Sequence, residues 1–379
     1  MSILRPTDYL TDKQRDIIDF CINNKENLFI EGPPWSGKVL TCLYGLQGIV
    51  KRNNSKLLFM VSNNAMYGYM TMALEELEID ENVEMVSKNN LFWKMAGENW
   101  VSVSLNSDYH ENYDRILTKL LEEELDRRYD MVVVSEVQHY LPKEWDLIKR
   151  IAKRIVCYGD FKQAVFKNKV KKEVILGDCV HMKLNYCYED ESTKRLLCVR
   201  RHFFDDGECV KKEGECEADL TGDNGVFDMS VGYNVLDVRY EDEFKAIAQT
   251  IKKLEKEGGR VAIICPNNNR FLELSVYLES SGVEHYNYGI NNELRDHDFS
   301  SSMPLFLSVF NAEGLQFDHV IIFGFDEFNY VLEMKRKEVV LKNVLYVALT
   351  RARKSTYIIR HEHTVKELKE FAMRVGEYL

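Results

Sequence analysis

A nine-residue string near the amino terminus constrains the fold of this chain more than any other feature. The string, EGPPWSGKV at positions 31–39, has the glycine spacing and the lysine of a phosphate-binding P-loop. A strand is expected before it, over 27–30, and a helix from Lys38 onward, so that backbone N–H groups and the Lys38 ammonium would face phosphate. The last position, where such loops place a magnesium-binding Ser or Thr, holds Val39, and an isopropyl group cannot bind a metal.

Apolar runs along the chain predict an α/β fold. Strands are expected over 27–30, 57–61, 131–134 and 155–158 in the first half, and over 261–265, 304–309, 319–323 and 355–360 in the second. Helices are expected between strands, among them 241–257, 270–280 and 342–349. This alternation is typical of parallel sheets with helices on both faces.

The length and composition suit two domains. The chain has 379 residues, of which 45% are hydrophobic, enough for two cores. We place the boundary between 167 and 180, which gives expected domains over 1–172 and 173–379. The polar stretch 80–128 is predicted to be an insertion or a helical layer beside the first sheet.

Composition also bears on compartment and partners. No run of about 18 apolar residues appears, and the start lacks the order of a signal peptide, so we expect a cytoplasmic protein without a membrane span. The nine cysteines are scattered and are most simply core thiols. With a net charge of −11, any contact with nucleic acid would have to come from a local basic groove.

Polar residues follow two further strands of the first half. The apolar run at 131–134 ends in Ser135 and Glu136, where P-loop enzymes place a magnesium-holding Asp and, in many cases, a Glu that polarises water. The next strand ends in a Gly-Asp-x-x-Gln turn from Gly159 to Gln163, whose side-chain amide suits a γ-phosphate. Sites in parallel sheets lie at this edge, where the strands end.

In this order the motifs resemble those of superfamily 1 helicases of the UvrD/Rep type. LTDKQ at 10–14 resembles the adenine-reading Q motif, and VSNNAM at 61–66 the motif that touches the single-strand backbone. LSVFNAEGLQFD at 307–318 resembles motif V, and YVALTRAR at 346–353 motif VI. The resemblance spans nearly the whole chain and implies two tandem RecA-like domains that sandwich ATP. The large second-domain insertion would be missing, because the stretch 281–306 is too short for a further domain.

The resemblance also implies roles for individual residues. Nucleotide binding would fall to Gln14, Gly32, Ser36, Gly37, Lys38, Val39 and Gln316. Glu136 and Gln163 would be the water and γ-phosphate contacts, and Arg351 the γ-phosphate arginine from the second domain. These three are the candidate catalytic residues, and ATP is the implied cofactor.

Several positions depart from the family pattern. Val39 and Ser135 remove both protein groups that would bind or orient magnesium, so Mg²⁺ binding by these groups is not expected. Thr41 is no substitute, because two residues along a helix turn a side chain by about 200°. Cys187 stands where a second phosphate-contacting Arg belongs. Since one such arginine can contribute about 10³ to 10⁵ in rate, we expect slow or absent hydrolysis.

Motif V departs as well. Phe310 and Glu313 replace its His and Lys, which removes a contact to nucleic acid and adds a negative charge. Gln316 replaces its Glu and keeps hydrogen-bonding capacity.

Three functions stay open on these residues. The leading one is a helicase-like protein with a nucleotide cleft between two RecA-like domains and impaired Mg-dependent ATP hydrolysis, acting with a nucleic-acid-processing partner such as a nuclease. The second is an active DNA-dependent ATPase or helicase in which water completes the magnesium shell. The third is an interaction scaffold that binds no nucleotide. The expected nucleic-acid partner is a single strand, with DNA favoured over RNA.

Two other groups of residues are candidate binding sites, one for a metal and one for nucleic-acid bases. The segment 179–216 holds soft metal ligands, namely Cys179, His181, Cys187, Cys198, His202, Cys209 and Cys216. No paired C-x-x-C spacing occurs, which favours ordinary thiols over zinc. Base stacking and core packing are both open for the aromatic residues Tyr67, Tyr69, Phe161 and Phe166.

Overall fold

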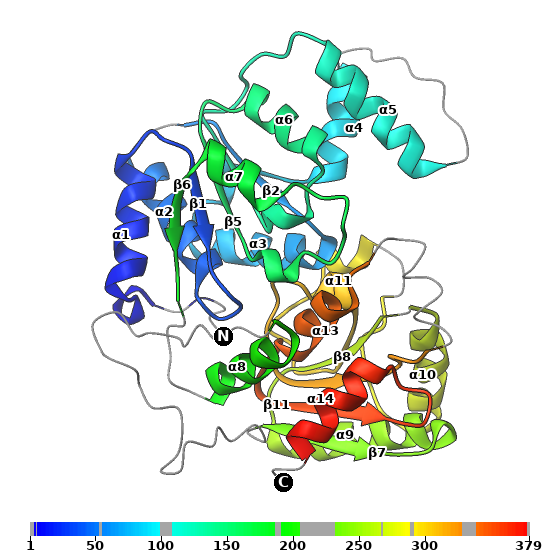
Figure 1. Cartoon of the computed structure of the whole chain (residues 1–379). Coiled ribbons are helices and arrows are strands. Elements are labelled where there is room, and N and C mark those ends of the chain that lie inside the picture. The colour runs from blue at the N-terminus through cyan, green and yellow to red at the C-terminus, as the bar shows by residue number, and fades with distance from the viewer. Residues whose placement is uncertain are drawn as a thin grey trace. The chain divides into compact units, whose positions relative to one another are not determined.

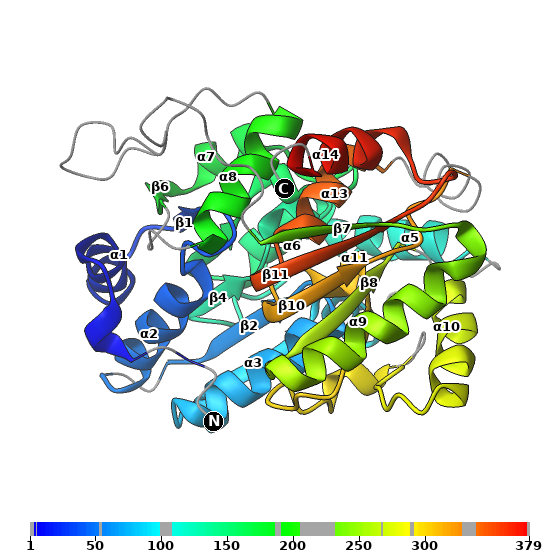
Figure 2. The same cartoon turned by 90° about the horizontal axis from the view of Figure 1, so that it is seen from below.

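Strands of four to nine residues form two separate parallel β-sheets in the described part of the chain (Figures 1 and 2). The structure is a computed structural model that describes residues 4, 6–52, 55–98, 108–185, 191–204, 232–266, 268–288, 292–327 and 339–376. The first unit comprises residues 1–164 and 168–184, and the second comprises 165–167 and 185–379. Parallel sheets covered by helices on both faces confirm the predicted α/β fold class.

The first sheet has six strands in the order β3-β2-β4-β5-β1-β6, and all neighbours are parallel. The strands are β1 Leu28–Glu31, β2 Leu57–Val61, β3 Val83–Ser87, β4 Met131–Val134, β5 Ile155–Gly159 and β6 Val180–Lys183. Every residue of β2, β4 and β5 is buried, as a sheet covered on both faces requires. Because β1, β5 and β4 are neighbours, the segments that follow them meet at one carboxyl edge.

Helices cover both faces of the first sheet (Figure 1). On one face lie α1 Asp12–Asn23, α2 Lys38–Val50 and α3 Asn64–Glu76. On the other lie α4 Lys88–Glu98, α5 Tyr109–Glu122, α6 Pro142–Ile151 and α7 Lys172–Asp178. The core of that second face includes Phe92 and Trp145, which have no exposed surface. These placements follow from right-handed crossovers between parallel strands.

The second sheet has five parallel strands in the order β7-β11-β10-β8-β9. They are β7 Tyr233–Asp237, β8 Val261–Cys265, β9 Leu305–Ser308, β10 Phe317–Ile322 and β11 Ala352–Arg360. One face carries α9 Glu243–Glu257 and α10 Asn268–Ser280. The other carries α8 Glu191–Phe204, α11 Val309–Ala312, α13 Leu341–Leu349 and α14 Lys366–Gly376.

Short 3-10 turns join several of these elements. They are η1 Thr7–Tyr9, η2 Asp80–Asn82, η3 Val137–His139, η4 Phe161–Gln163, η5 Tyr240–Asp242 and η6 Asn292–Arg295. In the described part of the chain, each helix is too short or too polar to span a bilayer.

The structure adds three strands that the sequence did not predict, namely β3, β6 and β7. All three lie at sheet edges and most of their side chains are only half-buried, so they lack a continuous apolar run. The stretch 80–128 therefore contributes β3 to the sheet in addition to α4 and α5. The first unit extends to Leu184, beyond the expected limit at 172, because α7 and β6 complete the first sheet.

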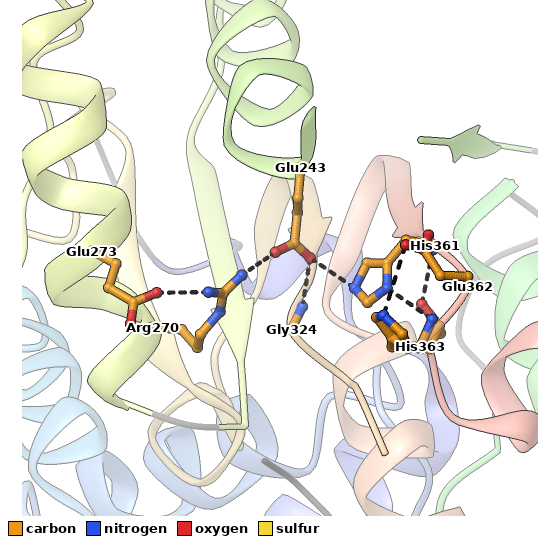
Figure 3. Close-up of polar contacts among 8 residues, drawn as sticks. Glu243, Arg270, Glu273, Gly324, His361, Glu362 and His363 are labelled. Atoms are coloured by element: carbon orange, nitrogen blue, oxygen red, sulfur yellow. Dashed lines mark hydrogen bonds and ion pairs between the residues drawn. The ribbon is translucent and has the colours of Figure 1, made fainter. Parts of the chain in front are cut away.

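A buried charge network closes the carboxyl edge of the second sheet (Figure 3). Glu243, in the first turn of α9, accepts a hydrogen bond from Arg270 of α10 and, at 3.2 Å, from the N–H of Gly324. His361 Nε2 lies 3.5 Å from the same carboxylate, while its Nδ1 accepts from the N–H of His363 at 3.1 Å. The side chains of Glu243 and His361 are each 1% exposed. The anion at this edge is therefore one of the protein's own carboxylates.

Candidate functional site

The P-loop string connects β1 to α2 at the carboxyl edge of the first sheet, in the strand–loop–helix context that the sequence predicts. The N–H of Gly32 donates to Gly159 O on β5 at 3.2 Å, and the N–H of Ser36 donates to Pro33 O at 3.3 Å. A Cβ at Gly32 would lie 2.4 Å from Ser36 Oγ, so only glycine fits there. Gly37 adopts φ 80° at the start of α2. The loop thus wraps tightly before the amino end of the helix, the geometry that suits an anion.

Backbone strain concentrates at this edge. Of the three non-glycine residues with positive φ in the described part of the chain, Trp35 (φ 71°) and Glu136 (φ 48°) both lie here. The left-handed region costs an L-residue about 1–2 kcal/mol. Such strain persists where the surrounding structure enforces it, and it clusters at functional sites.

Lys38 and Gln14 hold the loop from two sides. Lys38 is 6% exposed, and its Nζ donates to Pro33 O at 3.1 Å. Gln14 Nε2 donates to Ser36 O at 3.1 Å, while its Oε1 accepts from the N–H of Thr11 at 2.9 Å and closes a capping box on α1. Gln14 thus supports the P-loop backbone in this structure, and its adenine-reading role stays a prediction.

The residues at the magnesium position do not fit a metal. Ser135 directly follows β4 and has no exposed surface, and its hydroxyl lies beside the phenol of Tyr158. Burial and the nearby charge of Glu136 raise the pKa of Tyr158 well above its usual value, and the Ser135 hydroxyl only partly offsets this. The Thr41 hydroxyl donates to Gly37 O at 2.9 Å, within its own helix. Val39 offers no oxygen, so these residues do not support a magnesium-dependent step.

Gln138 joins the ends of β4 and β5. Its Nε2 donates to Glu136 Oε2 at 2.7 Å, and its Oε1 accepts from the N–H of Asp160 at 3.3 Å. A Cβ at Gly159 would lie 2.2 Å from Gln138 Oε1, which explains the glycine of the Gly-Asp-x-x-Gln turn. In that turn the N–H of Gln163 donates to Asp160 O at 2.8 Å. Glu136 and Gln163 therefore lie at the same edge as the P-loop, each 2% exposed.

A carboxylate lies directly beneath the P-loop. Glu31, the last residue of β1, binds Lys172 of α7 and lies 2.7 Å from His181 Nε2 of β6. Burial raises the pKa of Glu31, but the hydrogen bonds and charges of Lys172 and His181 outweigh burial and bring the pKa below its ordinary value. The His181 ring also stacks on Phe29, with centroids 5.4 Å apart. These contacts compensate a negative charge that would otherwise repel phosphate.

The two candidate residues of the second unit lie near each other at the amino edge of its sheet. Gln316 immediately precedes β10, and Arg351 immediately precedes β11. The N–H of Phe317 donates to Arg351 O at 3.0 Å, and Gln316 Oε1 accepts from Arg353 Nη2 at 3.4 Å.

The Arg351 side chain turns back onto the end of α13. Its Nε donates to Val347 O at 2.9 Å, and its Nη2 donates to Thr350 Oγ1 at 2.9 Å. Arg351 is only 2% exposed. A contact of this guanidinium with phosphate would require it to exchange these hydrogen bonds.

Phe310 and Glu313, the two main departures in motif V, both lie in packed surroundings. Phe166 and Phe310 stack on each other within the second unit, with ring centroids 5.4 Å apart and planes 16° apart. Glu313 is 4% exposed. Phe161 packs edge-on against Phe29 at 6.0 Å, which favours the core reading for this ring.

The described residues of the Cys/His-rich segment 179–216 form no metal-binding cluster. Among the described residues, Cys179 and Cys198 are thiols outside any disulfide. Cys187, Cys209 and Cys216 lie outside the described residues, as does the motif departure at Cys187. Among the described residues, no group of three or more His, Cys, Asp or Glu side chains could hold a metal.

Sequence reasoning missed several groups at the first edge. Gln138, Lys172 and His181 each bind a residue of the predicted site. The glycine before Asp160 was a usable signal for the close approach of Gln138. Nothing in the sequence pairs Lys172 or His181 with Glu31, because the contacts join residues about 140–150 positions apart.

Comparison with known proteins bears on the second unit most directly. The sequence profile of the UvrD-like helicase C-terminal domain matches residues 305–359. Among solved structures, the arterivirus nonstructural protein 10, a helicase, is similar over 92% of this chain, with 12% identity and a TM-score of 0.42. The similarity covers 61% of that structure, so this chain spans less than two thirds of its length. No curated protein sequence matches. Residues 305–359 are therefore similar to the C-terminal domain of UvrD-like helicases.

Proposed function

We propose that the chain binds a nucleoside triphosphate, with ATP favoured, through the P-loop of its first unit, and hydrolyses it slowly or not at all. The observation that carries this proposal is the P-loop at the carboxyl edge of the first sheet, with Gly37 at the start of α2 and Lys38 in its first turn. The same edge holds Glu136 and Gln163. The strained backbone of Trp35 supports a site whose geometry is enforced.

Phosphate fits this edge by charge as well as by shape. The backbone N–H groups at the amino end of α2 carry partial positive charge, and Lys38 adds a full one. Glu31 is compensated by Lys172 and His181. For the Lys38 ammonium, phosphate oxygens would replace the Pro33 carbonyl that it binds now.

Hydrolysis should be weak because the metal-binding groups and a free arginine are missing around Lys38. Charge stabilisation by a metal and by arginines accounts for most of the catalysis of phosphoryl transfer. Val39 and Ser135 cannot supply the metal groups, and Arg351 is folded back onto Val347 and Thr350. The nucleotide would therefore act as a bound effector more than as a source of energy through hydrolysis.

We further propose that the chain acts with a nucleic-acid-processing partner, such as a nuclease, and contacts single-stranded DNA. The similarity of residues 305–359 to the C-terminal domain of UvrD-like helicases supports a nucleic-acid context. The stacked Phe166 and Phe310 support a weakened grip on bases, because each ring already covers a face of the other.

The test compares nucleotide binding and single-strand-stimulated hydrolysis in the wild type and in Lys38→Ala. Fluorescent ATP should bind the wild type saturably, and Lys38→Ala should weaken binding by about 10- to 100-fold, because a charge-assisted hydrogen bond is lost. Lys51→Ala, at an exposed lysine just after α2, is the matched control and should leave the affinity unchanged. A Val39→Thr, Ser135→Asp double variant should gain magnesium-dependent turnover.

Each alternative gives a different result. Wild-type turnover that Lys38→Ala abolishes would show an active ATPase and overturn the impaired-hydrolysis proposal. Absence of binding in the wild type would overturn nucleotide binding and leave the scaffold function.

A further inference from the structure

A buried arginine of the second unit faces the turn that carries Arg351. Arg195, on α8, is 2% exposed. Its Nη1 donates to Lys354 O at 2.7 Å, and its Nη2 donates to Ala352 O at 3.3 Å and also to Arg353 O. These three carbonyls directly follow Arg351 in the chain. One guanidinium therefore binds the first three residues of β11 through their backbone.

Two neighbours of Arg195 reinforce the same turn. The Tyr233 hydroxyl donates to Leu349 O at 3.2 Å, on the amino side of Arg351. Gly232 has φ 72°, and a Cβ there would lie 2.0 Å from Arg195 Nη1. The guanidinium thus fills the space that glycine leaves at the start of β7. The backbone is held on both sides of Arg351, by α8 and by β7.

The chemistry of Arg195 suits this task. A planar guanidinium offers donors in fixed directions, so it can bind several carbonyls at once and select one arrangement of them. Its positive charge also lies near the carboxyl end of α13, where helix carbonyls carry partial negative charge. A buried charge is tolerated only when hydrogen bonds compensate its desolvation, so the turn and Arg195 fix each other.

We propose that Arg195 is a positioning residue for Arg351. By fixing the backbone of residues 352–354, it sets the direction in which the Arg351 side chain leaves the end of α13. This inference rests on the proposed function and adds one step to it: when a nucleoside triphosphate binds, the Arg351 guanidinium exchanges its hydrogen bonds to Val347 and Thr350 for the γ-phosphate. Arg195 itself touches no nucleotide in this account.

The experiment measures discrimination between tri- and diphosphate. Affinities for fluorescent ADP and for a fluorescent non-hydrolysable ATP analogue are determined for the full chain and five variants. Arg351→Ala should lower the preference for the ATP analogue by about 10- to 100-fold, the value of charge-assisted hydrogen bonds. Arg195→Met should lower it by about 5- to 50-fold while ADP affinity stays within about twofold. The Arg195→Lys preference should lie between those of the wild type and Arg195→Met, since an ammonium keeps the charge but cannot match the planar fork of donors.

Two further variants separate positioning from general loss of structure. Arg239→Met removes an arginine whose side chain is 81% exposed in the same unit, and it should leave the preference unchanged. Gly232→Ala keeps Arg195 but displaces its guanidinium, so it should reproduce the Arg195→Met result. If Arg195→Met does not fold, the nucleotide preference of Gly232→Ala alone tests whether Arg195 positions Arg351. An unchanged preference in both Arg195→Met and Gly232→Ala, with Arg351→Ala impaired, would overturn the proposal.

Amide hydrogen exchange distinguishes failure of this inference from failure of the proposed function. Arg195→Met should raise exchange of the amides at 350–354 by about tenfold or more, while amides of α9 keep their wild-type rates. If the wild type binds neither nucleotide, the proposed function fails and this exchange result alone decides whether Arg195 orders the turn. Unchanged exchange at 350–354 would overturn the inference in either case.

Discussion

The carboxyl edges of the two sheets have the same architecture but carry different side chains. At the first edge, the P-loop presents N–H groups and Lys38, and Glu31 below it is compensated by Lys172 and His181. At the second edge, Glu243 supplies a carboxylate to Arg270 and to the N–H of Gly324 (Figure 3). One edge is built to receive an anion, and the other already contains one.

This difference shows that parallel α/β architecture alone does not assign a binding site. Both edges offer helix amino ends and loop N–H groups, which favour anions. The side chains decide whether the anion comes from outside or from the protein. We therefore propose nucleotide binding at the first edge and a structural role for the second.

The largest expected effect comes from breaking the closed edge. Glu243→Gln keeps the volume but removes the charge that faces Arg270, whose side chain is 8% exposed, and His361. Breaking a buried ion pair typically costs about 3–5 kcal/mol, and we expect a loss of about 3 kcal/mol in the free energy of unfolding, measured by urea denaturation.

The matched control for this prediction is Glu241→Gln. The side chains of Glu241 and its partner Arg239 are 76% and 81% exposed, and surface pairs contribute about 0–1 kcal/mol. Equal losses in the two variants would contradict a structural role for the closed edge.

A smaller effect is expected from the charge balance of the first edge. Lys172→Met removes a partner that lowers the pKa of Glu31 below its ordinary value of about 4.5. A depressed carboxyl pKa stabilises the fold above the unfolded value and loses that contribution as the pH falls through the folded pKa. The variant should therefore lose about 1–2 kcal/mol at pH 7, and its deficit should shrink as the pH drops below about 4.5.

Denaturant titrations of wild type and variant across pH 3–7 check this dependence. Lys171→Met, at the exposed neighbouring lysine, should show no comparable deficit. A Lys172→Met deficit that grows toward low pH would contradict the charge-balance account.

The sequence predicts the buried parts of this fold better than its edges. The strands at 57–61, 131–134 and 261–265 have their predicted bounds, because central strands covered on both faces need continuous apolar runs. The unpredicted strands β3, β6 and β7 are edge strands with half-buried side chains. The edge strand β9 was predicted because all four of its residues are buried.

In the candidate site, the sequence likewise predicts local motifs but not the contacts between segments that are far apart in the chain. The P-loop, Glu136 and Gln163 lie in local strings whose order predicts a common sheet edge. The contacts of Gln14 with Ser36 and of Glu31 with Lys172 depend on packing between distant segments, so no local pattern reveals them. Glu243 and Arg270 carry no motif at all, although they fill the equivalent edge of the second sheet.

The most direct test of the central assignment is amide hydrogen exchange of the wild type with and without ATP. Binding at the first edge should protect the amides of residues 35–40, while the amides of Gly324 and His363 at the second edge keep their rates. Protection at the second edge, or saturating ATP without protection at 35–40, would contradict the assignment.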